Sequence, residues 1–248
     1  MRRDRKIVAI GGGELGTGET LPIDRRIVEL TGKRRPRALF VPTASSDSPR
    51  YVRKFEQVYG RRLGCAIDVL RLCADPPSRR QISAAVMASD LVYVGGGNTY
   101  RMMRTWRRLG VDAILVRAAT RGIVLSGLSA GAICWFSHGL SDSFRARDPK
   151  RWDYIRLRGL GLIDLLYCPH VDVERRRAAL RRAIARRGGV AVACDDRVAL
   201  EIIGDTYRVL RSSQAALAYR GFKARGKVVL ERIEPTCAPE PLAALLDR

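Results

Sequence analysis

The segment at residues 127–131 reads Gly-Leu-Ser-Ala-Gly, which matches the G-x-S-x-G pattern of a serine held on a sharp turn between a strand and a helix. An apolar run at residues 123–125 precedes the segment, and a small-residue helix start at residues 130–133 follows it. Glycine on either side of the serine leaves room for a tight and strained turn. The pattern therefore predicts that Ser129 is a nucleophile.

A serine nucleophile needs a base, and the chain has only two histidines. His170 follows an apolar run at residues 165–168, so we expect it at the carboxyl end of a strand, on the same edge of the sheet as Ser129. His138 comes on or just past the helix that follows the serine, and we expect it to point away from Ser129. We therefore predict that His170 is the base.

The acid that orients this histidine has three candidates. Asp195 and Asp196 end the apolar run at residues 190–194, again at the active edge, where either carboxylate could accept the second ring N–H of His170. Asp142 lies in the Ser-Asp-Ser segment at residues 141–143 and would give the chain order Ser, Asp, His of the α/β hydrolases. The residue types alone leave these three carboxylates as alternatives.

Acyl transfer also needs backbone N–H groups that stabilise a developing oxyanion. Ala130 directly follows the serine and supplies one such donor. The Gly-Gly-Gly-Asn segment at residues 95–98 follows another apolar run, and its glycines let the main chain approach a substrate closely. We predict Gly97 as the second donor, with Gly96 and Asn98 as substrate-binding neighbours.

Neither a cofactor nor a metal ion is predicted. Residues 11–16 read Gly-Gly-Gly-Glu-Leu-Gly and fit the dinucleotide-binding pattern G-x-G-x-x-G, but the acidic residue expected after the second strand is missing, because residues 38–41 run into Pro-Thr-Ala-Ser. The six cysteines are scattered without a C-x-x-C pair, so the sequence supports neither a zinc site nor a disulfide framework.

The elements that must position these residues alternate along the chain. Most apolar runs are continuous rather than alternating, which is typical of strands covered on both faces. Expected strands lie at residues 6–10, 38–41, 66–70, 91–94, 123–125, 165–168, 190–194 and 199–203, and expected helices include residues 51–63, 100–109, 111–121 and 174–187. This alternation predicts an α/β fold with a doubly wound, mostly parallel sheet, helices on both faces, and a short antiparallel C-terminal edge after residue 199. Without a repeat or a long linker, we expect residues 1–248 to form a single domain.

The charge is strongly basic, with 46 Lys and Arg against 25 Asp and Glu among 248 residues, a formal net charge of +21. Such a charge is typical of nucleic-acid-binding proteins, yet no helix-turn-helix, RNA-recognition or zinc-finger pattern accompanies it. The densest stretch, residues 174–187, is typical of an amphipathic helix with a solvated basic face. We expect a cytoplasmic protein, because the chain shows no signal peptide and no apolar run that could span a bilayer.

Taken together, these segments resemble the peptidase E family of serine peptidases. The residues that carry the resemblance are VGGGNT at 94–99, LSGLSAGAICWF at 125–136, the Ser-Asp-Ser at 141–143, RGLGLID at 158–164 and CPH at 168–170. The segments IVAIGGGE and FVPTASSD also resemble the peptidase E-like branch found in bacteria, so the resemblance covers nearly the whole chain. It implies a class I glutamine amidotransferase-like fold.

By this resemblance, Ser129 is the nucleophile and His170 the base, Gly97 and Ala130 line the oxyanion hole, and the family's acid falls on Asp196 with Asp195 one step away. The enzymes first characterised carry Glu at that position and cleave dipeptides with an N-terminal aspartate. This chain lacks their G-E-T-R segment after the histidine, so aspartyl specificity does not follow. The expected partners are a small peptide substrate and, in a homodimer, a second copy of the chain; nucleic acid and membranes are not expected.

Three alternatives differ in chemistry or substrate. A glutaminase-type amidotransferase would use cysteine at the turn, whereas residue 129 is serine. A hydrolase of a storage polymer such as cyanophycin would use the same triad with a different substrate groove. A basic α/β binding protein would retain the serine turn without catalysis.

Overall fold

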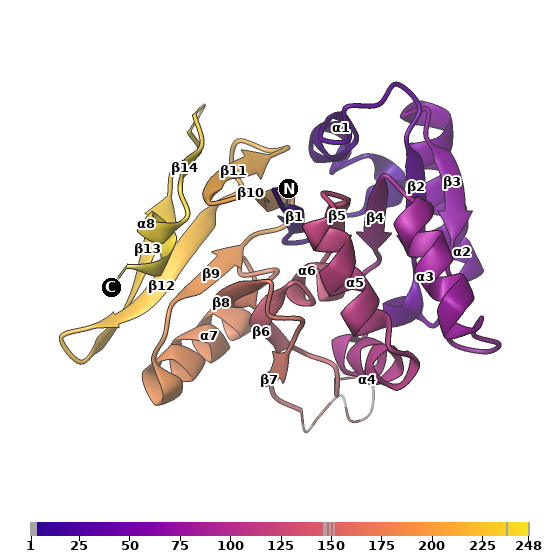
Figure 1. Cartoon of the computed structure of the whole chain (residues 1–248). Helices are drawn as coiled ribbons and strands as arrows, with labels where there is room; N and C mark the ends of the chain where they lie inside the picture. Colours follow the sequence, from indigo (N-terminus) through magenta and orange to yellow (C-terminus); the bar gives the residue numbers. More distant parts are fainter. Residues whose placement is uncertain (1–3, 146–147, 149, 151, 237, 248) are drawn as a thin grey trace.

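The computed structural model describes residues 4–145, 148, 150, 152–236 and 238–247, and in them the strands form two sheets flanked by helices (Figure 1). The eight-stranded sheet runs β14 (Glu240–Pro241), β11 (Thr206–Arg211), β10 (Val198–Ile203), β1 (Lys6–Ile10), β5 (Val124–Leu128), β4 (Leu91–Val94), β2 (Arg37–Val41) and β3 (Ala66–Val69). The six-stranded sheet runs β13 (Lys227–Ile233), β12 (Ala218–Ala224), β9 (Ala191–Cys194), β8 (Ile163–Cys168), β6 (Phe136–Ser141) and β7 (Ile155–Arg158).

The five strands from β3 to β1 pair in parallel, whereas β10, β11 and β14 continue the sheet antiparallel. Alternate side chains of β1 enter different cores: Ile7 and Ala9 join one cluster, and Val8 and Ile10 join another. The first cluster includes side chains of α3 (Arg79–Ala88), α4 (Thr99–Leu109) and α5 (Val111–Thr120); the second includes side chains of α1 (Leu21–Glu29), α2 (Pro49–Phe55) and the π-helical segment η3 (Glu56–Arg62). Burial on both faces explains why these strands are continuous apolar runs.

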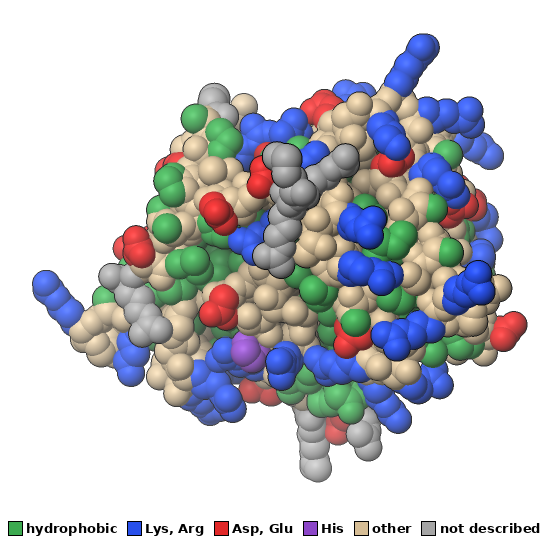
Figure 2. Space-filling view, in the orientation of Figure 1, with side chains coloured by type: hydrophobic (Ala, Val, Ile, Leu, Met, Phe, Trp, Pro, Cys, Tyr) green, Lys and Arg blue, Asp and Glu red, His purple; other side chains and the backbone are tan. Residues whose placement is uncertain are grey.

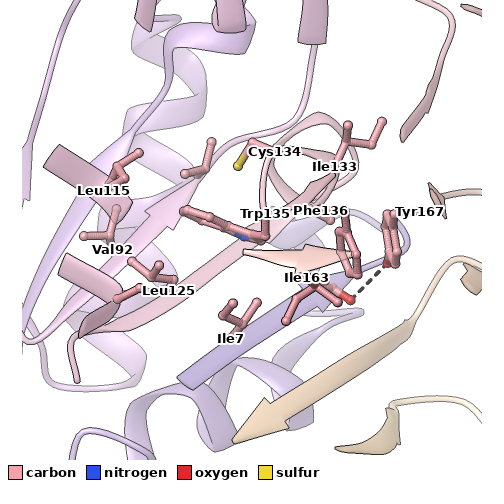
Figure 3. Packing of buried hydrophobic residues seen from close by; sticks show 14 of the residues in the cluster. Ile7, Val92, Leu115, Leu125, Ile133, Cys134, Trp135, Phe136, Ile163 and Tyr167 are labelled. Carbon is pink, nitrogen blue, oxygen red and sulfur yellow. Dashed lines mark hydrogen bonds between the residues drawn. The ribbon is translucent and has the colours of Figure 1, made fainter. Parts of the chain in front are cut away.

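The six-stranded sheet is joined to the rest through the first cluster. Phe136 and Tyr167 stack with ring centroids 4.5 Å apart, and the Tyr167 hydroxyl donates to the Ala9 carbonyl of β1 at 3.0 Å (Figure 3). The opposite face of this sheet packs on Leu180 and Ile184 of α7 (Glu174–Arg187). The chain is therefore a mixed α/β protein with two sheets, and a continuous apolar core connects them.

Most expected elements lie within a few residues of the observed ones. The prediction of one sheet was wrong, because strands β8 and β9 pair with β6 and β12 in a second sheet. Burial on both faces gives these strands the same apolar pattern as the others, so local sequence does not tell which sheet a strand joins. The parallel pairings are also fewer than expected, since antiparallel strands extend both sheets. The expected helix at residues 51–63 divides into α2 and η3.

The charged side chains are widely distributed. Figure 2 shows Lys and Arg spread over one face of the molecule with acidic side chains among them, rather than gathered into one stripe. In the described part of the chain, no helix has the length and apolar character that crossing a membrane requires.

Candidate active site

Ser129 lies between β5 and the short helix α6 (Ala130–Ile133), with φ 55° and ψ −109°. This backbone conformation is rare for a residue with a side chain and marks a strained turn. A Cβ on Gly127 would collide with the Gly131 carbonyl, and a Cβ on Gly131 would collide with the Val94 carbonyl. The flanking glycines of the G-x-S-x-G segment are therefore required by the close approach of β5, β4 and α6.

His170 reaches this serine from the carboxyl end of β8. Its Nε2 lies 2.8 Å from Ser129 Oγ, and its Nδ1 is in hydrogen-bond contact with Asp196 Oδ1 in the turn after β9. The hydrogen bond with His170 lowers the pKa of Asp196 below its ordinary value, outweighing the burial that raises it. Since an ionised carboxylate only accepts hydrogen bonds, Nδ1 carries the proton, and Nε2 is free to accept the proton of the Ser129 hydroxyl.

The side chains of the other two candidate acids contact groups other than His170. Asp195 turns toward Leu217, whose backbone N–H donates to its Oδ2 at 2.9 Å, and burial raises the pKa of Asp195. Asp142 pairs with Arg176 of α7 at 2.9 Å. Neighbouring positions in a turn point in different directions, so Asp195 and Asp196 cannot both face the histidine.

The second histidine lies apart from this group, on the strand that follows helix α6. Helix α6 ends at Ile133 and the chain enters β6 at Phe136, so His138 belongs to that strand. Its Nδ1 lies 3.1 Å from an Arg156 guanidinium nitrogen, and its pKa is lowered by burial and by the nearby arginines.

The glycine segment after β4 lies beside the serine. A Cβ on Gly96 would be 3.6 Å from Ser129 Cβ, and a Cβ on Gly97, whose φ is 138°, would collide with the Ala44 carbonyl. The Gly96 N–H donates to the Tyr51 hydroxyl at 3.3 Å. Among the described residues, the amides of Gly97 and Ala130 have no protein acceptor, so both remain available to a substrate oxygen.

Asn98 has a positioning role in the free protein. Its Oδ1 accepts from the Arg101 backbone N–H at 2.9 Å and caps α4, while its Nδ2 donates to the Ser143 carbonyl at 2.7 Å. Both polar atoms of the side chain are therefore occupied by the protein.

Gly12 is a site residue that the sequence reasoning missed. A Cβ at this position would overlap Asp196 Oδ1 and the Cε1 and Nδ1 atoms of His170. The adjacent backbone is tied to the acid's turn, because Arg197 N–H donates to the Gly12 carbonyl at 2.9 Å. The sequence signal for this residue is the run of three consecutive glycines after the first strand, which also fits the dinucleotide-binding pattern.

A pocket of about 470 Å³ opens over this group. Its wall includes Ser129, His170, Tyr51, Arg50 and Lys54. Lys54 pairs with Glu14 at 2.9 Å across the same wall. The volume is that of a small-molecule site, and the wall combines hydroxyl, charged and main-chain groups.

The described residues contain no group of three or more His, Cys, Asp or Glu side chains that could hold a metal ion. Within the same residues, five cysteines are free thiols, and Cys237 lies outside them.

Comparison with known proteins gives consistent matches. A family model described as Peptidase family S51 matches residues 7–210. An uncharacterized peptidase of Bacillus subtilis (strain 168), YgaJ, is 35% identical over 228 residues, covering 90% of this chain and 95% of its own. Peptidase E of Citrobacter koseri is 32% identical over 109 residues, which cover 44% of this chain and 43% of that enzyme.

Solved structures share the fold at low sequence identity. The crystal structure of a peptidase from an acI-B1 Actinobacterium superposes with a TM-score of 0.72 at 16% identity, covering 97% of this chain and 98% of that chain. A candidate peptidase E protein from Listeria monocytogenes superposes with a TM-score of 0.65 at 19% identity, covering 85% of this chain and 100% of that chain.

Proposed function

Because this chain belongs to peptidase family S51, we propose that it hydrolyses peptide bonds with Ser129 as nucleophile, His170 as base and Asp196 as the orienting acid. Family membership confirms the resemblance to peptidase E and makes the chain a peptidase. The observation that best supports these roles is the series of contacts from Ser129 Oγ through both ring nitrogens of His170 to the Asp196 carboxylate.

In the proposed reaction, His170 Nε2 removes the hydroxyl proton of Ser129 while Oγ attacks the substrate carbonyl carbon and forms a tetrahedral intermediate. The ionised Asp196, whose pKa is lowered by its hydrogen bond with His170, stabilises the imidazolium. His170 then gives this proton to the leaving amine as the C–N bond breaks, and the acyl group remains on Ser129. Water, deprotonated by His170, hydrolyses the ester and restores the serine.

The amides of Gly97 and Ala130 would stabilise the oxyanion of this intermediate. Two facts support them: neither amide has an acceptor among the described residues, and their segments flank Ser129. Fixed main-chain donors of this kind contribute about 3 kcal/mol each to acyl transfer. Gly96, whose missing side chain keeps the space beside Ser129 open, would admit the substrate backbone.

We propose small peptides as the substrates, because the pocket over Ser129 has a volume suited to a short segment. Dipeptides with an N-terminal aspartate are included, since Arg50 adds positive charge to a wall where Lys54 is already paired with Glu14. A cyanophycinase-like hydrolase of a peptide polymer is the alternative that would use the same three side chains.

Three finer points are also proposals. We propose that the two-sheet architecture is a variant of the class I glutamine amidotransferase-like fold, and that residues 1–248 make up one domain. A homodimer is proposed as the assembly, which light scattering of the purified chain would test.

The decisive experiment is hydrolysis of a mixed dipeptide library, with Asp-X members included, by the wild type and by Ser129→Ala. Ser137→Ala is the matched control, because this serine lies on β6 and donates to Asp164. We expect cleavage by the wild type and the control, and loss of it in Ser129→Ala. Cleavage that persists in Ser129→Ala would refute the role of the serine. No cleavage by any of the three would refute the dipeptide substrate, and a peptide polymer would be tried next.

A further inference from the structure

A buried guanidinium lies behind the proposed triad and takes no part in the mechanism above. Arg176, in the first turns of α7, has a side chain only 5% exposed. Arginine is almost never buried this deeply unless its charge is paired, because removing it from water is costly. Neighbouring groups must therefore offset the free energy of removing this guanidinium from water.

Three groups surround the Arg176 guanidinium. One nitrogen donates to the Pro169 carbonyl at 3.2 Å, and another donates to the Asp142 carboxylate at 2.9 Å. The guanidinium also lies over the Tyr154 ring, 4.7 Å from its centroid. The contact with Pro169 matters most for catalysis, because that carbonyl belongs to the peptide bond that leads into His170.

His170 itself has an unfavourable backbone conformation, with φ 50°. A residue with a Cβ remains in this region only where neighbouring groups hold it. The next arginine of the helix also contacts this segment, since Arg177 Nε donates to the Val171 carbonyl at 3.3 Å. Arg176 and Arg177 thus bind the carbonyls on both sides of His170.

Asp142, the ion-pair partner of Arg176, connects this helix to the segment that carries Gly97. Asp142 belongs to the Ser-Asp-Ser segment. The backbone carbonyl of the next residue, Ser143, accepts a hydrogen bond from the Asn98 side chain at 2.7 Å. The Ser143 hydroxyl accepts the Tyr100 backbone N–H at 3.0 Å. Both interactions hold the segment that carries Gly97. The Ser-Asp-Ser segment therefore links the proposed oxyanion donor to the loop that carries the base.

We propose that the ion pair between the buried Arg176 and the partly exposed Asp142 is a positioning device that holds the His170 ring in place beside Ser129, an inference that rests on the proposed function. Arg176 does not line the pocket over Ser129, so a role in binding substrate directly does not fit its location. The pair also gives a role to the aspartate of the Ser-Asp-Ser segment. Asp142 lies between Ser129 and His170 in the chain, as a triad acid of the α/β hydrolases does, but it contacts Arg176 instead of His170.

The test compares Arg176→Met, Arg176→Lys and Asp142→Asn with the wild type. Arg182→Met is the matched control, because Arg182 lies on the same helix in an exposed pair with Asp153. Each protein is measured in two ways: kcat and KM per serine titrated with a fluorophosphonate, and the NMR signal of the His170 ring. The chain has only two histidines, so His138→Gln assigns the spectrum.

We expect Arg176→Met to lower kcat by about 10- to 100-fold with KM within about twofold, because a shift of His170 by a fraction of an ångström to 1 Å misaligns the proton transfer. The low-field Nδ1 proton of His170 should broaden or disappear in this variant and persist in Arg182→Met. Asp142→Asn should lose less, because Arg176 keeps the Pro169 carbonyl, and Arg176→Lys should recover part of the loss.

Two results would overturn the proposal. A wild-type kcat and an unchanged His170 resonance in Arg176→Met would show that the pair only stabilises the fold, even if Tm falls. A raised KM with unchanged kcat would indicate a substrate-binding role instead. If the wild type cleaves no peptide, the proposed function fails, while the NMR comparison still decides whether Arg176 positions His170.

Discussion

Replacing Gly12 with alanine would place a methyl group where the His170 ring and the Asp196 carboxylate now lie. The new Cβ would overlap three atoms of that pair: Asp196 Oδ1 and the Cε1 and Nδ1 atoms of His170. The overlap involves the ring of the proposed base and the carboxylate oxygen that accepts the hydrogen bond of its Nδ1–H, rather than the end of a flexible side chain. The Gly12 backbone cannot withdraw easily, because its carbonyl accepts the Arg197 N–H at 2.9 Å.

The size of the effect follows from the required displacement. Carbon atoms in contact lie about 3.5–4.0 Å apart, so the ring and the carboxylate must move by more than about 1 Å. A misplacement of that size costs about 100-fold in rate, or about 2.7 kcal/mol in activation free energy. Overpacking costs about 1–3 kcal/mol of stability, partly offset by the lower entropy of the unfolded chain. For a protein of this size the net change lowers Tm by about 2–8 °C.

The assay is the second-order rate at which a fluorophosphonate modifies Ser129, because this reaction needs the base but no particular peptide. Thermal melts show how much of each variant is folded at the assay temperature. Gly60→Ala is the control, since its Cβ would meet the Ile67 side chain, at 3.2 Å, and none of the three proposed catalytic side chains. A rate for Gly12→Ala within about twofold of the wild type would refute the reasoning that this glycine is required by the His–Asp pair.

Two further predictions concern carboxylates. Asp196→Asn should lower kcat/KM by about 10⁴-fold, the loss typical of triads whose acid becomes an amide. Asp196→Glu should lower it by about tenfold, since Gly12 lies so close that no space is left for another methylene. Steady-state kinetics test both, and activities equal to that of the wild type would contradict the prediction. Asp24 is buried against Thr20 and Tyr59, and burial raises its pKa from 3.8 to about 6. Its folded form therefore binds a proton more tightly than the unfolded chain, so its contribution to stability is full below about pH 4 and is lost as pH rises to 6. Asp24→Asn should remove about 2 kcal/mol of the decrease in unfolding free energy between pH 4 and pH 7, and urea melts with the same pH dependence as the wild type would contradict this.

Much of the site was predictable because it depends on local sequence. The Gly-Leu-Ser-Ala-Gly segment is a local pattern that predicts a strained turn after a strand, and the structure has such a turn at Ser129, with φ 55°. His170 was expected at the active edge because an apolar run ends just before it, and the structure brings its ring to Ser129. The helix at residues 174–187 was predicted to the residue, because its arginines and alanines favour helix and Gly188 ends it.

The parts that could not be predicted depend on contacts between distant residues. Whether Asp195 or Asp196 faces the histidine is decided by the Asp195 backbone and side chain, which both pair with Leu217 more than twenty residues away. The division into two sheets depends on which strands pair, and apolar runs of equal length do not encode that choice. The role of Arg176 was hidden among seven arginines in one helix, since burial singles it out only in the folded chain.

The choice of aspartate at position 196 and of glycine at position 12 has one physical explanation. An aspartate side chain is one methylene shorter than glutamate, so its carboxylate reaches the histidine only if the backbone comes closer. Gly11 and Gly12 permit this approach: Gly11 N–H donates to the Val198 carbonyl at 2.7 Å, and Arg197 N–H donates to the Gly12 carbonyl at 2.9 Å. These bonds hold the turn that carries Asp196 against the end of β1, and the absence of a Cβ on Gly12 leaves the space that the His–Asp pair fills. The shorter acid and the glycine should therefore change together: a glutamate at position 196 should become tolerable only where the turn is held farther from β1.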